Sequence, residues 1–141
     1  MTRVELMQPA GLATSPERPV ILVVDDEVLL RCAVAEYLRD CGFHVLEAAS
    51  GAEAVAVLSA DVVVDMVFSD VQMPGELNGY ALAQWVRTNR PGIHVLLTSG
   101  YPGQAKLAAG ASADWTLLIK PYDYEYLQQH IRRLTGQRDD A

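Results

Sequence analysis

The chain has 141 residues, of which 50% are apolar and 21% are charged, and this composition is that of one ordinary globular domain. A formal net charge of -7 argues against a general nucleic-acid surface, which needs a basic patch. No apolar stretch approaches a membrane-spanning length, and the N-terminus lacks the pattern of a signal peptide. We therefore expect a cytoplasmic protein that binds neither nucleic acid nor membrane directly.

The sequence predicts one folded unit between two polar ends. Residues 1–18 lack hydrophobic periodicity and contain several proline, glycine and serine residues, which predicts a flexible leader. The periodic segments all fall within residues 19–135, the predicted domain. Residues 136–141 predict a short polar tail, with no room for an output domain.

Apolar segments alternate with helical patterns along the predicted domain. The predicted strands cover residues 20–24, 43–48, 66–69, 93–97 and 115–119. The first predicted helix ends at Gly42, the second runs from a capping box at Ser50 to Leu58, and the third covers residues 80–88. A short fourth helix is flanked by glycines, and the fifth begins near Asp123. This alternation predicts a doubly wound α/β fold, with five helices around a five-stranded parallel sheet.

The two cysteines are expected to be free thiols. Cys32 and Cys41 lie nine residues apart on the first predicted helix. A helical rise of about 1.5 Å per residue separates them by roughly 13 Å, which is too far for a disulfide.

Charged and hydroxyl residues directly follow four of the predicted strands. These residues are Asp25, Asp26, Asp70, Thr98 and Lys120. Ligands bind at the carboxyl ends of the strands in an open parallel sheet, so we expect these residues to meet at one edge. Taken singly, each also has a plainer interpretation: an acidic helix cap, a turn-capping threonine or a solvated lysine.

Three neighbouring carboxylates predict a cation site. They repel one another unless a cation intervenes, and hard oxygen ligands favour Mg²⁺ with waters completing its shell. Asp26 and Asp70 are the expected direct ligands, while Asp25 acts through water. The backbone carbonyl near Gln72 is a further candidate ligand.

The same residues predict phosphoryl transfer. A carboxylate beside Mg²⁺ can attack phosphorus and form an acyl phosphate. Asp70, at the middle of the sheet, is the candidate acceptor, while Thr98 and Lys120 hold the remaining phosphoryl oxygens.

Four segments resemble the receiver domains of two-component response regulators: ILVVDDE at residues 21–27, SDVQMPG at 69–75, LTSG at 97–100 and IKPY at 119–122. The resemblance covers about residues 20–135 and implies the flavodoxin-like strand order 2-1-3-4-5. It also implies that Asp70 takes a phosphoryl group from a histidine of a sensor kinase or a phosphotransfer protein. Asp25 and Asp26 would then be the Mg²⁺ pair, Thr98 the switch hydroxyl and Lys120 the phosphate-pairing lysine.

The resemblance further implies a stand-alone switch that acts by binding an unidentified downstream protein and turns over no separate substrate, or equally an intermediate or sink in a phosphorelay. Its readout surface would be the fourth helix, the fifth strand and the fifth helix, which can also pair two copies of the chain. Exposed apolar residues at the start of the first helix, Val28, Leu29 and Cys32, would be a docking site. One position departs from the family: Leu117 replaces the aromatic residue that commonly precedes the lysine by three positions.

Two other functions remain as alternatives. One is a constitutive interaction module that keeps the fold without phosphorylation, for which Leu117 is the supporting feature. The other is a Mg²⁺-dependent phosphohydrolase similar to the haloacid-dehalogenase-like enzymes. Those enzymes place a second Asp two positions after the nucleophile, whereas here Asp25 and Asp26 are adjacent and residue 27 is Glu.

Overall fold

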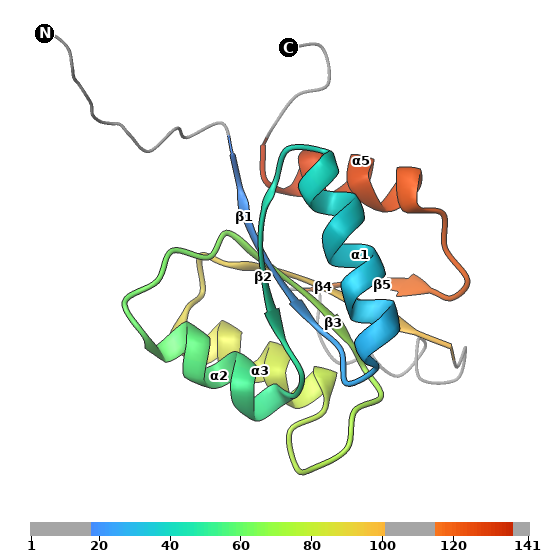
Figure 1. Cartoon of the computed structure of the whole chain (residues 1–141). Helices are drawn as coiled ribbons and strands as arrows, with labels where there is room; N and C mark the ends of the chain where they lie inside the picture. The colour runs from blue at the N-terminus through green and yellow to red at the C-terminus, as the bar shows by residue number, and fades with distance from the viewer. Residues whose placement is uncertain (1–17, 101–114, 137–141) are drawn as a thin grey trace, which may run out of the picture.

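The computed structural model describes residues 18–100 and 115–136. Strands and helices alternate along the chain (Figure 1). The elements are β1 (Val20–Val24), α1 (Val28–Asp40), β2 (His44–Ala48), α2 (Gly51–Ser59), β3 (Met66–Asp70), α3 (Gly79–Asn89), β4 (His94–Ser99), β5 (Trp115–Ile119) and α5 (Tyr124–Leu134). The predicted fourth helix falls on residues outside the described ranges.

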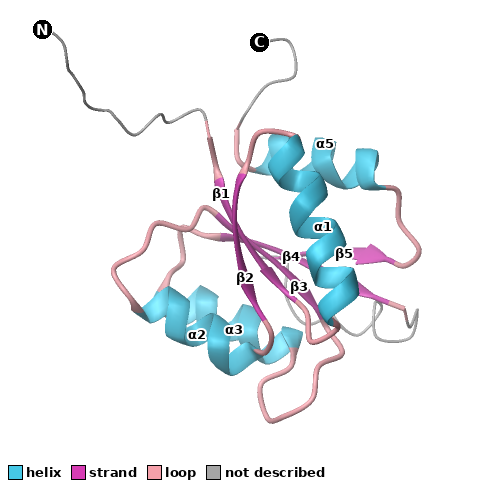
Figure 2. Ribbon diagram, viewed as in Figure 1, coloured by secondary structure: helices cyan, strands magenta, loops and turns pink. Residues whose placement is uncertain are grey.

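The five strands form one parallel sheet in the order β2-β1-β3-β4-β5, which confirms the predicted fold and strand order. Helices α1 and α5 cover one face of the sheet, and α2 and α3 cover the other (Figure 2). Among the described helices, none combines the length and the apolar character needed to cross a bilayer.

Side chains of β1 alternate between two hydrophobic cores. Ile21 and Val23 pack in the core under α1 and α5, whereas Leu22 and Val24 pack in the core under α2 and α3. All four are buried. Successive strand residues point to opposite faces, so a strand covered on both sides needs a continuous apolar run.

Local polar contacts set the ends of the helices. Ser50 accepts a hydrogen bond from the Glu53 amide at 3.1 Å, and Glu53 accepts one from the Ala49 amide at 2.8 Å, so the predicted capping box begins α2. Gly42 follows α1 with φ +102°, a conformation that glycine adopts without strain. Cys32 and Cys41 are both free, as predicted.

The start of α3 lies directly against the end of β3. The Gly79 amide donates to the Val71 carbonyl at 3.0 Å. A Cβ atom at Gly79 would lie 2.5 Å from the Asp70 carbonyl oxygen, closer than real Cβ contacts allow. Glycine therefore permits this backbone approach, which holds the β3–α3 connection beside Asp70.

Candidate functional site

The sheet register brings the predicted site residues to one edge. Asp70 is the last residue of β3 and pairs with Thr98 of β4, and Ser99 pairs with Ile119 of β5. Strands β3 and β4 extend one and two residues beyond their predicted ends, because the Val71 amide continues the ladder by donating to the Thr98 carbonyl at 2.9 Å. The strands consequently end level with one another.

Four predicted site residues line one hollow of about 240 Å³: Asp25, Asp70, Thr98 and Lys120. The other two, Asp26 and Gln72, line a second recess that shares Asp70 and Lys120 with the hollow. The structure thus places the other five predicted residues around Asp70.

The Asp70 carboxylate is buried and held at both oxygens. Only 7% of the residue is exposed. Lys120 Nζ donates to Oδ2 at 3.0 Å, and the Gln72 amide donates to Oδ1 at 3.1 Å. The Lys120 amide in turn donates to the Ser99 carbonyl at 2.9 Å, which anchors the base of the lysine. A buried charge is tolerated when it is paired and hydrogen-bonded, so this carboxylate has one defined orientation.

Asp25 is held by its backbone and its side chain together. Its amide donates to the Ala48 carbonyl at 3.1 Å, and its Oδ1 accepts the Glu27 amide at 2.9 Å. Its carbonyl accepts a hydrogen bond from Arg31 Nη1 at 2.9 Å. Arg31 also pairs with Glu47 of β2, with Nε and Oε1 3.0 Å apart. This guanidinium therefore ties the acidic loop to α1 and β2.

Burial raises the pKa of the Asp25 carboxyl above its ordinary value. The hydrogen bond from the Glu27 amide lowers that pKa in part, while the negative charge of Asp70 raises it further. The positive charge of Lys120 lowers it and the charge of Asp26 raises it. Burial, together with the neighbouring carboxylates, therefore makes ionisation of Asp25 unfavourable, and an added cation would relieve the repulsion between the carboxylates.

The Thr98 hydroxyl is buried without a hydrogen-bond partner among the described residues. Only 3% of the residue is exposed. An unsatisfied buried polar group costs about 1–3 kcal/mol. Thr98 lines the hollow beside its cross-strand partner Asp70, so its hydroxyl is available to a group attached to that carboxylate.

The donor set fits Mg²⁺ with waters in its shell. Within residues 18–100 and 115–136, no three His, Cys, Asp or Glu side chains lie close enough to hold a metal unaided. Mg²⁺ does not need such a cage, because it usually keeps several waters and binds one or two carboxylates. The recess lined by Asp26, Asp70 and Gln72 offers hard oxygen donors.

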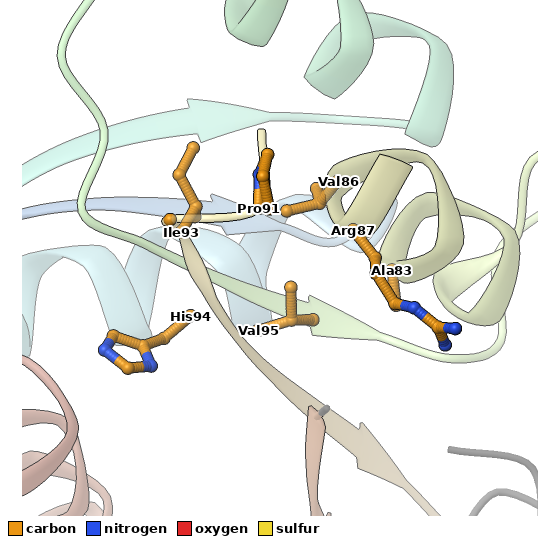
Figure 3. A pocket seen from close by; sticks show the side chains of 8 residues that line it. Ala83, Val86, Arg87, Pro91, Ile93, His94 and Val95 are labelled. Carbon is orange, nitrogen blue, oxygen red and sulfur yellow. The ribbon is translucent and has the colours of Figure 1, made fainter. Parts of the chain in front are cut away.

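A separate hollow of about 330 Å³ lies where α3 ends and β4 begins (Figure 3). It lies at the amino-terminal end of β4, whereas the Asp70 site lies at the carboxyl ends of the strands. Its lining consists of Ala83, Val86, Arg87, Pro91, Gly92, Ile93, His94 and Val95. None of these residues is a carboxylate, so the hollow lacks the chemistry of the Asp70 site.

Sequence reasoning missed two residues of the site. Arg31 follows the acidic pair by five positions, and the presence of one basic residue so near two acidic ones could have indicated a contact between them. Tyr122 belongs to the IKPY motif but was not singled out, although it lines the hollow with Asp70. By contrast, the expected exposure at the start of α1 is confirmed, since Val28 is 58% and Leu29 85% exposed.

Comparison with known proteins points to one family. The family model for the response regulator receiver domain matches residues 21–132. The chain is 34% identical over 122 residues to the C4-dicarboxylate transport transcriptional regulatory protein DctD of Rhizobium meliloti (strain 1021), a match that covers 85% of this chain and 26% of DctD. It is 33% identical over 121 residues to the sensor kinase CckA of Brucella abortus (strain 2308), covering 84% of this chain and 13% of that protein. The chain thus spans about a quarter or less of these relatives.

Solved structures show the same likeness. A response regulator receiver protein from Sinorhizobium medicae WSM419 superposes with a TM-score of 0.77 at 28% identity, covering 86% of this chain and 98% of that one. The receiver domain of the hybrid histidine kinase CckA gives a TM-score of 0.67 at 34% identity, covering 82% and 98%. With its sheet order and the family match over most of its length, this chain belongs to the response regulator receiver domain family of two-component systems.

Proposed function

We propose that this receiver accepts a phosphoryl group on Asp70 from a phosphohistidine and thereby switches its binding to another protein. The observation that carries the proposal is the buried Asp70 carboxylate, which is paired with Lys120 at 3.0 Å and lies beside the Thr98 hydroxyl, for which the described residues offer no hydrogen-bond partner. One acceptor, one cation and one free donor are the groups that a phosphoryl group on Asp70 would need.

In the proposed reaction, a carboxylate oxygen of Asp70 attacks phosphorus and an acyl phosphate forms. The P–N bond of the phosphohistidine breaks, and its electron pair stays on the imidazole nitrogen, which takes a proton from solvent. Lys120 pairs with a phosphoryl oxygen, and the Thr98 hydroxyl donates to another. The chain turns over no separate substrate in this scheme.

Mg²⁺, when bound by Asp26, Asp70 and the backbone carbonyl of Gln72 with Asp25 acting through water, would neutralise charge on the phosphoryl oxygens. The remaining work belongs to the chain itself. The Gln72 amide holds one oxygen of Asp70 in place, and burial of the carboxylate excludes bulk water from the reacting atoms.

The proposed donor is a sensor histidine kinase or a histidine phosphotransfer protein. Exposed Val28 and Leu29 at the start of α1 follow directly after the acidic loop, so an apolar patch adjoins the acceptor site. A donor with an apolar contact surface and basic residues would match this patch and the acidic rim beside it.

Leu117 favours a second candidate function, an interaction module that works without phosphorylation. Leu117 packs against the core under α2 and α3 and replaces the aromatic residue common in the family. In this alternative the acidic site would be a structural remnant, and the protein would bind its partner equally well with Asp70→Asn.

The test is intact-mass spectrometry after incubation with acetyl phosphate, with and without Mg²⁺. We expect one Mg²⁺-dependent phosphoryl adduct, which Asp70→Asn abolishes. Asp61→Asn is the matched control, because Asp61 is exposed in the α2–β3 connection at the other edge of the sheet, and it should label normally. Absence of the adduct, where a known receiver labels in parallel, would reject phosphoryl transfer and favour the interaction module.

A further inference from the structure

Tyr122 and Thr98 lie on the same side of the sheet. Leu96, two residues before Thr98 on β4, packs in the core under α1 and α5, so the Thr98 side chain points to that face. Tyr122 packs against the same core. Leu117 packs against the opposite core, under α2 and α3. Tyr122 therefore shares a face with the Thr98 hydroxyl, whereas Leu117 does not.

The hollow between these residues can accommodate movement of an aromatic ring. It measures about 240 Å³ and is lined by Phe68, Tyr122 and Tyr124 on its aromatic side, and by Asp70 and Thr98 at its polar end. A cavity of about 150 Å³ is enough to hold benzene. A rotation of the Thr98 side chain would therefore change the shape of a hollow that is large enough for the Tyr122 ring to move in.

Aromatic contacts connect this hollow to the junction of α1 and α5. The rings of Phe68 and Tyr122 meet edge to face with centroids 5.9 Å apart, and those of Tyr122 and Tyr124 are 6.2 Å apart. Tyr124 is the first residue of α5, and its ring lies 5.1 Å from that of Tyr37 on α1. Phe68 is two residues before Asp70, so the four rings lead from the acceptor strand to both helices.

We propose that Tyr122 transmits phosphorylation of Asp70 to the α1–α5 junction by moving within this hollow. The inference rests on the proposed function, because it requires a phosphoryl group on Asp70. When the Thr98 hydroxyl turns to pair with that group, the wall of the hollow changes, and Tyr122 repacks against Tyr124. The contact between α5 and α1 changes as a result, and this junction becomes a surface on which a partner reads the phosphorylated state.

The electrostatic surroundings of Tyr122 favour a neutral phenol. Burial raises the pKa of Tyr122, and the nearby Tyr124 phenol and the negative charges of Asp25 and Asp70 raise it further. The phosphoryl group would carry about 1.5–2 negative charges in place of the single charge of the Asp70 carboxylate. Tyr122 thus keeps its proton, and its ring responds to phosphorylation by repacking.

The test follows the tyrosines by ¹⁹F NMR in protein that carries 3-fluorotyrosine. The chain has six tyrosines, and each resonance is assigned by a Tyr→Phe variant. After incubation with acetyl phosphate and Mg²⁺, we expect the resonances of Tyr122, Tyr124 and Tyr37 to shift in proportion to the adduct measured by intact mass. Tyr80 on α3, which packs against the opposite core, is the internal control and should not shift.

Two variants separate transmission from the chemistry. Tyr122→Leu should form the adduct, yet the Tyr124 and Tyr37 resonances should no longer shift; Tyr122→Phe, which keeps the ring, should retain most of the shift. Tyr126→Leu is the matched control, because Tyr126 is 49% exposed on α5 and does not line the hollow, and it should behave like the wild type.

Three results would overturn the inference in distinguishable ways. A full adduct with an unmoved Tyr122 resonance would refute transmission through Tyr122 while leaving phosphoryl transfer intact. A persistent Tyr124 shift in Tyr122→Leu would do the same. Absence of any adduct would refute the proposed function, and the inference with it.

Discussion

Replacing Thr98 by valine should stabilise the unphosphorylated protein. The substitution removes a buried hydroxyl that has no partner in the described part of the chain and keeps a β-branched side chain suited to a strand. An unsatisfied buried polar group costs about 1–3 kcal/mol, so the free energy of unfolding should rise by about 1–2 kcal/mol. For a domain of this size, the midpoint of thermal unfolding should rise by about 3–8 °C.

After phosphorylation, the wild type should be more stable than Thr98→Val. In the wild type the Thr98 hydroxyl gains a charged acceptor on Asp70, and a hydrogen bond to a charged group contributes about 1.5–3 kcal/mol. The valine variant cannot make this bond, so phosphorylation should stabilise it less. The assay is urea unfolding followed by tryptophan fluorescence, with and without acetyl phosphate and Mg²⁺, since a small domain unfolds in one transition.

Thr135→Val is the matched control. The Thr135 hydroxyl donates to the Ile131 carbonyl at 2.8 Å, so its removal should cost about 1 kcal/mol of stability. Loss of stability in unphosphorylated Thr98→Val would show that the Thr98 hydroxyl is satisfied, and the role given to it would then be wrong.

Three further predictions concern the acidic cluster and the β3–α3 connection. The pKa of Asp25 is raised in the folded state, so ionisation of this carboxyl lowers the free energy of unfolding as the pH rises above 3.8. Asp25→Asn removes this effect and should therefore raise the urea midpoint at pH 7. The gain should be smaller near pH 4, where the carboxyl is largely protonated, and smaller when Mg²⁺ is present. Asp26→Ala should reduce the rise in thermal midpoint that Mg²⁺ gives the wild type, and an unchanged rise would remove Asp26 as a ligand. Gly79→Ala forces a Cβ against the Asp70 carbonyl and should cost about 1–3 kcal/mol, whereas Gly92→Ala, with nothing within 4 Å, should be near neutral by the same denaturation assay.

The sequence predicted the sheet because buried parallel strands are continuous apolar runs. Its strand ends were less accurate: β4 extends to Ser99 because backbone hydrogen bonding continues past the apolar run. Side-chain identity carries no signal for that extension. The polar residues after the strands nevertheless marked the site, because Asp70 and Lys120 come together from the topology alone.

Contacts between elements could not be predicted in the same way. The bond from Arg31 to the Asp25 carbonyl depends on the rotation of α1 over the sheet. The shared face of Thr98 and Tyr122 depends on the register of β4 and on the path of the chain after β5. The roles of the six site residues, including those proposed for Mg²⁺, stay predictions until phosphorylation and metal binding are measured.

The two faces of the sheet should differ in how readily they accept amino-acid substitutions. Thr98 and Tyr122 lie on the α1–α5 side, so under the proposed mechanism substitutions there would alter signalling and folding together. On the α2–α3 side, Leu117 and its neighbours contribute packing alone, and any apolar side chain of similar volume would serve. Of the two cores, the one under α2 and α3 should therefore accept apolar substitutions more readily, except at Gly79 and Gly51, where a Cβ would lie 2.5 Å and 2.3 Å from a backbone oxygen.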